Sequence, residues 1–307
     1  MNREKYISEL KFEIKEQGYG KYYTTKCVEY AERLLDNSLP VIFDINHLAI
    51  LIGTTSSYLS KIMFADYSFY SKASIPKKSG GVRILHIPTL ELKYIQRWIL
   101  DNILKNMHVS IYAMGFCDNK SIVDNAKLHV AQECVINLDI KDFFPSVSFE
   151  KVFRIFVYYG YTKEMSFALS KLCTCEGRLP QGSPASPCLS NIACLKLDAR
   201  LSALAEKYEA KYSRYADDIT FSGNRGIKKI NYIATSILAD EGFKVNDKKT
   251  RMAFPYQRQE VTGLIVNGDK IRVNKHYKKS LYQEIYYCIK FGLQNEYVGG
   301  VEHPGRL

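Results

Sequence analysis

The feature that most constrains the fold is a pair of adjacent aspartates inside a segment that otherwise has the composition of two β-strands. Asp217 and Asp218 interrupt the run from Tyr212 to Phe221, which is rich in tyrosine, isoleucine, threonine and phenylalanine. This composition predicts a strand, a turn and a second strand, with both carboxyl groups at the turn. A third aspartate, Asp139, lies near the end of the apolar run from Val135 to Ile140.

The run that carries Asp139 has the alternation of a β-strand. Side chains on a strand point alternately to opposite faces, so two sets of three residues are expected to face opposite ways. The first face is expected to carry Ile136, Leu138 and Ile140, and the second Val135, Asn137 and Asp139.

Three carboxyl groups beside apolar strands need a physical explanation. A carboxylate is costly to bury unpaired, and adjacent acids raise each other's pKa unless a cation neutralises them. Mg²⁺ takes oxygen ligands, and two such ions about 3.5–4 Å apart can activate a hydroxyl and stabilise a leaving oxygen at phosphorus. The alternative is that Asp139 caps a strand end while Asp217 and Asp218 form a solvated turn. The pair inside a hairpin, with a third aspartate on another strand, favours the metal site.

The rest of the chain alternates helices with strands and hairpins, which favours an α+β fold over a doubly wound sheet. Helices are expected over most of 1–65 with a break at 36–40, and over 90–104, 186–209, 227–241 and 275–291. Hairpins are expected about Gly80–Gly81 and, within 261–273, about Asn267–Gly268. The glycine-rich tail at 298–307 is not expected to be helical.

Charge and composition narrow the function classes. Lys and Arg outnumber Asp and Glu by 43 to 32, a net charge of +11, which favours a polyanionic partner, although a chain can also be merely basic. The 23 tyrosines and 15 phenylalanines are compatible with base stacking. No apolar run approaches the roughly 18–20 residues of a membrane span, and no secretory signal is present, so a soluble cytoplasmic protein without a membrane partner is expected. The eight cysteines include no C-x-x-C pair, which favours free thiols.

Three sequence motifs lie at and between the aspartates. The box 215–218 (Y-A-D-D) and the segment 137–146 (N-L-D-I-K-D-F-F-P-S) resemble the Y-x-D-D box and the first palm motif of reverse transcriptases. Between them, 179–187 (L-P-Q-G-S-P-A-S-P) resembles the P-Q-G-x-P-x-S-P motif. The spacing also fits, with 181 − 139 = 42 and 217 − 181 = 36 residues.

Two shorter signatures narrow the resemblance to bacterial retron reverse transcriptases. Residues 125–129 (N-A-K-L-H) match their N-A-x-x-H element, and 261–263 match their V-T-G triplet. The resemblance implies an α+β right-hand polymerase fold with fingers, palm and a short thumb. The implied division is an N-terminal helical region at 1–70, fingers at 71–134 with parts of 145–180, a palm with inserted fingers elements at 135–266, and a reduced thumb at 267–307.

By this resemblance Asp139, Asp217 and Asp218 are the catalytic carboxylates, and two Mg²⁺ ions are the cofactor. Asp139 and Asp217 are the expected direct ligands, because successive residues of a turn cannot aim at one ion equally well. Ile140 corresponds to a position that offers only its backbone to a metal. Lys249 would neutralise or protonate the departing pyrophosphate, and a charged surface turn is its alternative.

The resemblance also implies contacts to the incoming nucleotide. Arg83 resembles the arginine that holds the triphosphate, because its planar fork pairs two oxygens, and Lys77 or Lys78 would be a second phosphate contact. Gln181 resembles the residue lying against the incoming sugar and template base. Gly182 lets the backbone approach closely.

Phe144 occupies the position of a steric gate, where a bulky ring would clash with a 2′-OH and select deoxynucleotides. Phe143, its neighbour, is expected to face the core. The alternative is that both rings belong to the core.

Five residues of the two short signatures are candidates for RNA recognition: Asn125, His129, Val261, Thr262 and Gly263. For Asn125 and His129 a role in loop structure is the alternative, and a structural histidine with satisfied hydrogen bonds is the stronger expectation for His129.

The implied activity is RNA-directed DNA synthesis that copies a structured non-coding RNA, with dNTPs, into a branched RNA–DNA molecule (msDNA). A separate effector protein and a role in anti-phage defence are implied with it. The alternatives are another bacterial reverse transcriptase, of the group II intron or abortive-infection type, and an RNA-binding scaffold whose palm no longer turns over.

Overall fold

The computed structural model of the chain describes residues 3–65, 69–76 and 81–292. The predicted phosphate contacts Lys77 and Lys78 lie outside the described residues, as does the tail at 298–307. None of the described helices is both long and apolar enough to cross a membrane.

Helices make up most of the described chain, and many begin at a side-chain cap. Thr89 and Thr162, for example, accept a hydrogen bond from the amide three residues later. The α-helices are α1 (Arg3–Glu16), α2 (Lys21–Asp36), α3 (Ile45–Ile52), α4 (Ser56–Phe64), α5 (Leu90–Asn102), α6 (Ile122–Lys127), α7 (Phe149–Tyr158), α8 (Lys163–Cys173), α9 (Ser186–Ala193), α10 (Leu195–Lys207), α11 (Ile230–Asp240) and α12 (Lys275–Phe291).

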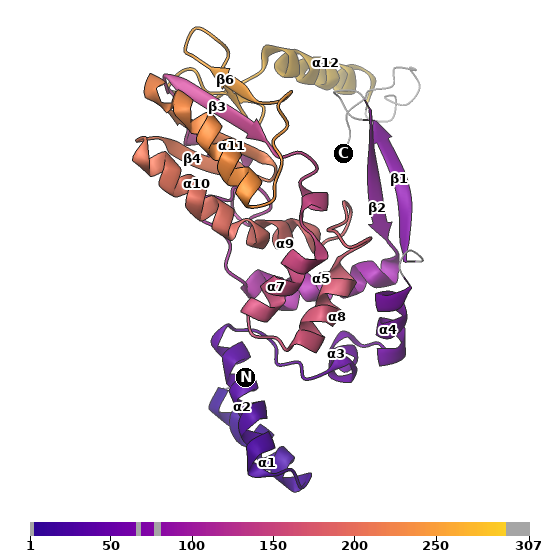
Figure 1. Cartoon of the computed structure of the whole chain (residues 1–307). Helices are drawn as coiled ribbons and strands as arrows, with labels where there is room; N and C mark the ends of the chain where they lie inside the picture. The colour runs from indigo at the N-terminus through magenta and orange to yellow at the C-terminus, as the bar shows by residue number, and fades with distance from the viewer. Residues whose placement is uncertain (1–2, 66–68, 77–80, 293–307) are drawn as a thin grey trace.

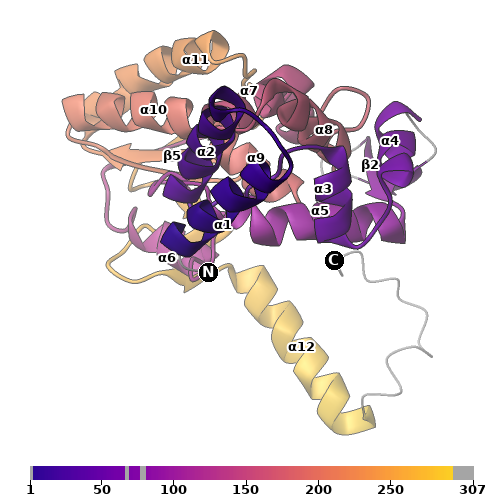
Figure 2. The same ribbon diagram turned by 90° about the horizontal axis from the view of Figure 1, so that it is seen from below.

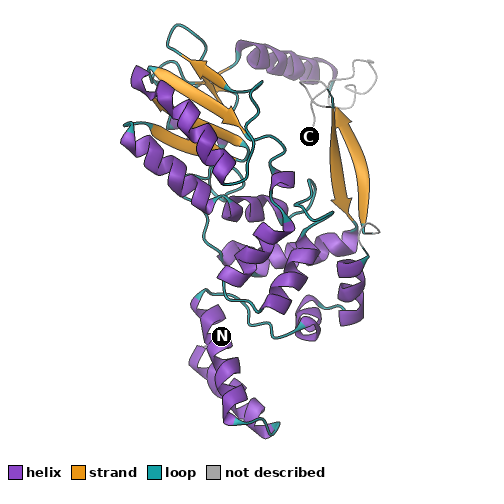
Figure 3. Cartoon of the chain, viewed as in Figure 1, coloured by secondary structure: helices purple, strands orange, loops and turns teal. Residues whose placement is uncertain are grey.

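The described strands form three antiparallel sheets. Figure 3 shows the four-stranded sheet and the β1–β2 hairpin as separate groups of strands, with helices between and below them. The strands are β1 (Tyr70–Pro76), β2 (Val82–Pro88), β3 (Cys134–Asp139), β4 (Lys211–Tyr215), β5 (Asp218–Gly223), β6 (Arg251–Ala253), β7 (Glu260–Val261), β8 (Leu264–Ile265) and β9 (Arg272–Val273).

The central sheet has the order β4-β5-β3-β6, which places the Asp139 strand between the second half of the aspartate hairpin and β6. Helices α10 and α11 lie together over this sheet (Figure 1). Both faces of β3 are largely covered: Val135 and Asp139 are buried like Ile136 and Leu138, and Asn137 is half-buried. The alternation predicted from sequence is therefore compatible with the sheet, but it does not separate a solvent-exposed face of β3 from a buried one.

The β1–β2 hairpin reaches away from the helical body (Figure 1), and Gly81, the described member of the predicted glycine pair, directly precedes β2. At its base, the His86 amide donates to the Gln181 carbonyl, over 3.1 Å. Gly182, at φ +128°, makes this approach possible, because a Cβ there would lie 2.8 Å from the His86 carbonyl oxygen. The close approach expected at Gly182 is thus made, in this structure, by the backbone of β2.

The N-terminal helices and α12 lie at the margins of the molecule. Helices α1 and α2 extend from one end of the body, and α12 projects from it when viewed from below (Figures 1 and 2). Helix α12 has the predicted bounds 275–291, and none of its residues is buried.

Two helix predictions need correction. The expected helix 186–209 is two helices, because at Cys194 the amide bonds the carbonyl of Asn191, three residues back, instead of continuing the i−4 ladder. The expected helix 227–241 begins only at Ile230, after a 3₁₀ turn. The hairpin expected about Asn267–Gly268 is part of a three-stranded sheet, whose tighter turn lies at Thr262–Gly263.

Candidate active site

The three aspartates meet where β3 and β5 begin to separate. Asp139 and Asp218 are directly paired positions in the β3–β5 register. One residue further on, the Ile140 amide donates to the Asp217 carbonyl, over 2.9 Å. The predicted proximity of the three aspartates is therefore present, and it arises from the pairing of two strands about 80 residues apart in sequence.

The Asp139 carboxylate has two partners, one on each oxygen. Lys249 Nζ donates to Oδ2 over 2.7 Å, and Asn246 Nδ2 donates to Oδ1 over 3.0 Å. The Asn246 amide also donates to the Asp139 carbonyl, over 2.8 Å. The turn 246–249 is thus fixed on the buried Asp139, which makes Lys249 a member of the carboxylate cluster and not only a charge on a surface turn.

The other two carboxyl groups are less well compensated. Desolvation raises the pKa of Asp218 to about 6, and repulsion by Asp217 and Asp139 adds to the effect, although part of this residue is exposed to solvent. The pKa of Asp217 is also raised, first by desolvation and then by Asp139, against the attraction of Lys249 and Arg83. The pKa of Lys249 is raised by its hydrogen bond to Asp139. The cluster therefore holds more negative charge than its own cations neutralise.

The donor set suits a hard dication. Its oxygens come from carboxylates and from the backbone at Ile140, which are ligands that Mg²⁺ prefers. No three acidic, histidine or cysteine side chains of the described residues stand close enough to enclose a metal by themselves. Because Mg²⁺ is commonly bound through one or two carboxylates plus substrate phosphates, an open cluster of this kind fits a metal that arrives with a nucleotide.

The residues predicted to contact the nucleotide come from three separate segments of the chain, and Arg83 is the one whose charge acts on this cluster. Arg83 is exposed on β2 and close enough to lower the pKa of Asp217. The Phe144 ring is half-buried, packed against Phe143 and Phe116 with ring centroids 5.5 and 5.9 Å away. Phe143 is 4% exposed, which confirms that it faces the core.

Gln181 is half-buried, and its side-chain oxygen is enclosed without a hydrogen-bond partner among the described residues. An enclosed acceptor without a donor is costly, so this oxygen is suited to accept from a ligand.

Asn125 and His129 lie inside the protein. His129 contacts Ser222 Oγ through Nδ1 and Ser213 Oγ through Nε2, over 2.7 and 2.8 Å. Ser213 Oγ in turn donates to Asn125 Oδ1 over 2.6 Å, and Asn125 and His129 are at most 1% exposed. Burial lowers the pKa of His129 to about 3, so the ring is neutral. This is the structural role that was the stronger expectation for His129 and the alternative for Asn125, and both side chains are buried away from any RNA.

The V-T-G triplet forms the turn between β7 and β8. Val261 is fully buried, whereas Thr262 and Gly263 form the turn with φ of 47° and 82°, the signs that a type I′ turn requires. The Thr262 hydroxyl donates to the Ile122 carbonyl over 3.2 Å, and Val261 packs in one cluster with Ala126. The two short signatures are therefore neighbours in space, and Thr262 and Gly263 are the residues of the triplet open to a partner.

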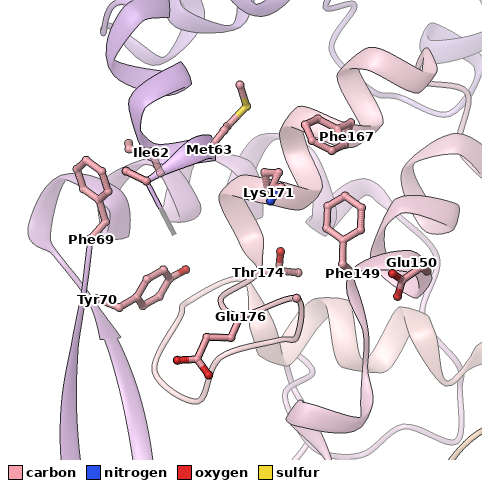
Figure 4. Close-up of a pocket in the computed structure, with 12 residues that line it drawn as sticks. Ile62, Met63, Phe69, Tyr70, Phe149, Glu150, Phe167, Lys171, Thr174 and Glu176 are labelled. Atoms are coloured by element: carbon pink, nitrogen blue, oxygen red, sulfur yellow. The ribbon is translucent and has the colours of Figure 1, made fainter. Parts of the chain in front are cut away.

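A separate cavity of about 330 Å³ lies where α4, α8 and the base of the hairpin meet (Figure 4). Phe69, Phe149 and Phe167 contribute rings to its wall, and Lys171 and Glu176 contribute charges. None of the predicted site residues lines it, so it is not part of the carboxylate cluster.

Sequence analysis missed two contributors to the site. Asn246 stands three residues before Lys249 on the same turn, and its amide side chain could have indicated a second partner for Asp139. The buried pair of Arg214 and Asp198 lies directly behind the aspartate turn, and no local pattern connects these two residues.

Comparisons with known proteins identify the family. Residues 75–274 match the family model described as Reverse transcriptase (RNA-dependent DNA polymerase). The chain is 33% identical over 268 residues to the Retron Ec86 reverse transcriptase of Escherichia coli, covering 85% of this chain and 84% of that protein. It is 39% identical over 218 residues to the Retron Mx65 reverse transcriptase of Myxococcus xanthus, covering 64% of this chain and 51% of that protein.

The fold has a solved counterpart. The telomerase of Candida albicans, solved in complex with a TWJ fragment of telomeric RNA, superposes with a TM-score of 0.51 at 12% identity, over 76% of this chain and 50% of that one. This likeness supports the right-hand polymerase fold expected from the motifs. The chain belongs to the retron-type reverse transcriptases, which are RNA-directed DNA polymerases.

Proposed function

We propose that the chain copies a structured non-coding RNA into DNA at the Asp139, Asp217 and Asp218 cluster, yielding a branched RNA–DNA product. The observation that carries this proposal is the direct pairing of Asp139 with Asp218 next to the Ile140–Asp217 hydrogen bond. It brings three carboxyl groups to one strand end, beside a lysine and near an arginine. An acidic cluster flanked by cations suits nucleotidyl transfer.

In this proposal Asp139 and Asp217 would hold two Mg²⁺ ions, and the Ile140 carbonyl and Asp218 would be further oxygen donors. When bound, the ions supply electrostatic stabilisation at the phosphate that reacts. Arg83 pairs the triphosphate oxygens, with Lys77 as a second contact, and Lys249 gives its proton to departing pyrophosphate. Each role follows from the resemblance, and for Arg83 and Lys249 also from the position of the side chain beside the cluster.

The remaining site residues select the incoming nucleotide and contact the RNA in this proposal. Phe144 crowds the sugar's 2′ position, and Gln181 uses its unpaired oxygen toward the incoming nucleotide. Gly182 lets the fingers hairpin sit close to Gln181. Thr262 and Gly263, at least partly exposed at the β7–β8 turn, are the part of the triplet that meets RNA, with Val261 as its buried anchor.

The proposed domains are those of the sequence: an N-terminal helical region, fingers, palm and a reduced thumb containing α12. We propose further that the protein works in the cytoplasm with a separate effector in anti-phage defence. These proposals rest on the family relationship.

The direct test is nucleotide incorporation. Purified protein with a primed RNA template, Mg²⁺ and dNTPs should extend DNA, and the double variant Asp217→Asn, Asp218→Asn should not. Tight RNA binding by the wild type without incorporation on any template would instead favour the RNA-binding scaffold. Sequencing nucleic acid that co-purifies from cells tests the product, because a branched RNA–DNA species distinguishes a retron enzyme from other bacterial reverse transcriptases.

A further inference from the structure

A fully buried arginine lies immediately behind the catalytic turn. Arg214, on β4, stands two residues before Ala216 and three before Asp217, and its side chain has no exposed surface. Its Nε and Nη2 donate to the two oxygens of Asp198, over 2.8 and 2.7 Å. Asp198 lies on α10, which packs against β4 (Figure 1), and is equally buried. Tyr212 also donates to Asp198, over 2.7 Å.

The third arm of the guanidinium is directed to the turn. Arg214 Nη1 donates to Asn191 Oδ1 over 3.0 Å and to the Ala216 carbonyl over 3.2 Å. One planar group therefore connects α10, α9 and the peptide that enters the aspartate pair. Because a guanidinium holds its donors in a fixed fork, its bidentate pair with Asp198 fixes the direction of Nη1.

A second contact holds the turn from another direction. Asn191 Nδ2 donates to the Gly115 carbonyl over 2.9 Å. A Cβ at Gly115 would lie 2.8 Å from the Ala216 amide nitrogen, so the two backbones touch. Asn191 thus bonds both Arg214 and the segment that presses on Ala216.

The turn needs such support because its backbone is unfavourable. Ala216 has φ of +57°, in the left-handed region that non-glycine residues seldom adopt. Its carbonyl orientation is coupled to the direction in which Asp217 leaves the turn. A buried ion pair is weak evidence for stability, since desolvation offsets much of the attraction. The hydrogen bond from Arg214 to the Ala216 carbonyl indicates another role for the Arg214–Asp198 pair, which is to position the turn.

We propose that Arg214 is a positioning residue, which holds the Ala216 carbonyl in the left-handed turn and so sets the positions of Asp217 and Asp218 for catalysis. Asp198 and Asn191 orient its guanidinium. The inference rests on the proposed catalytic role of the two aspartates, and it adds the device that gives them their geometry.

The primary test is Arg214→Lys, which keeps the buried charge but removes the fork. We expect kcat for single-nucleotide incorporation to fall roughly 10- to 100-fold, because small misplacements of catalytic groups have effects of this size. The KM for dNTP should change less, and the Mg²⁺ concentration for half-maximal rate should rise. The matched control is Arg200→Lys, since Arg200 joins α10 to Asp240 and Glu241 through a partly exposed fork, and none of these bonds involves the turn. It should keep the wild-type kcat.

A rescue experiment separates positioning from folding. Glycine adopts the left-handed conformation without penalty, so Ala216→Gly in the Arg214→Lys background should recover part of the lost kcat. The proposal is overturned if Ala216→Gly changes kcat by the same factor in the wild type and in Arg214→Lys, because the two substitutions would then act independently. It is also overturned if folded Arg214→Lys keeps the wild-type kcat. Should Arg214→Lys not fold, Asn191→Ala provides the test by leaving the ion pair intact: a loss of kcat supports positioning, and an unchanged kcat refutes it. A wild type without any incorporation would instead refute the proposed function.

Discussion

Lys249 occupies the carboxylate that the proposed metal ion would bind. In the structure its ammonium takes one oxygen of Asp139, and that bond raises its pKa. We therefore expect Lys249→Met to have two opposite effects. The kcat should fall about 10²- to 10⁴-fold through loss of a general acid, while the Mg²⁺ concentration for half-maximal rate should decrease because Asp139 loses a competitor.

Single-turnover incorporation measured across a Mg²⁺ titration checks both effects. The control is Lys248→Met, which removes the same charge from the exposed neighbour on the turn. An unchanged kcat in Lys249→Met would remove this lysine from the reaction and leave it a role in holding Asp139.

The two adjacent phenylalanines allow a matched comparison. The half-buried Phe144 ring is proposed to exclude a 2′-OH, whereas Phe143 is buried in the core. Phe144→Ala should relax discrimination against ribonucleotides, because the clash disappears. Phe143→Leu should lower the free energy of unfolding by roughly 1–3 kcal/mol without changing sugar selection. Competition between dNTP and rNTP measures the first and chemical denaturation the second. Equal discrimination in Phe144→Ala and wild type would contradict the gate.

Among the elements, the β1–β2 hairpin depends on Gly182 for its close contact with the segment at Gln181. In Gly182→Ala the new Cβ would meet the His86 carbonyl at 2.8 Å, so β2 must shift and carry Arg83 with it. We expect the KM for dNTP to rise about tenfold, with a smaller effect on RNA binding. Gly177→Ala is the control, because Gly177 also has a positive φ, but a Cβ added there would meet no other atom within 4 Å among the described residues. If both variants raise KM equally, backbone strain and not the clash explains the effect.

Sequence patterns predicted individual elements well and their junctions poorly. The aspartate hairpin follows from its β-forming residues, and the helix 275–291 from its periodicity. No glycine or proline in the sequence marks the helix break at Cys194. We attribute the break to contacts that Asn191 makes with segments distant in sequence. The Asp139–Lys249 pair joins residues 110 positions apart, so motif order suggested both members but could not indicate that they touch.

At the scale of the whole molecule, one buried network ties the first short signature to the central sheet. Asn125 and His129 come from the segment around α6, and their serine partners come from β4 and β5. Breaking this network would leave polar groups unpaired in the interior, which is costly. The resemblance indicated that these two residues matter, but only burial distinguishes an internal support from a surface that binds RNA.

This network predicts a pH dependence of global stability. Burial, with the nearby Lys211, lowers the pKa of His129 to about 3, whereas an unfolded histidine has an ordinary value near 6.5. Because the folded pKa is lowered, the unfolded state binds the extra proton, so the contribution is fully present above pH 6.5 and is lost as the pH falls toward 3. The free energy of unfolding should therefore drop by up to about 1.4 kcal/mol per pH unit from this group alone.

Denaturation of wild type and His129→Gln between pH 6.5 and 4 measures the difference in slope, in which the common carboxylates cancel. Parallel curves for wild type and His129→Gln would contradict the prediction, because they would mean that the folded protein protonates this ring as readily as the unfolded chain does.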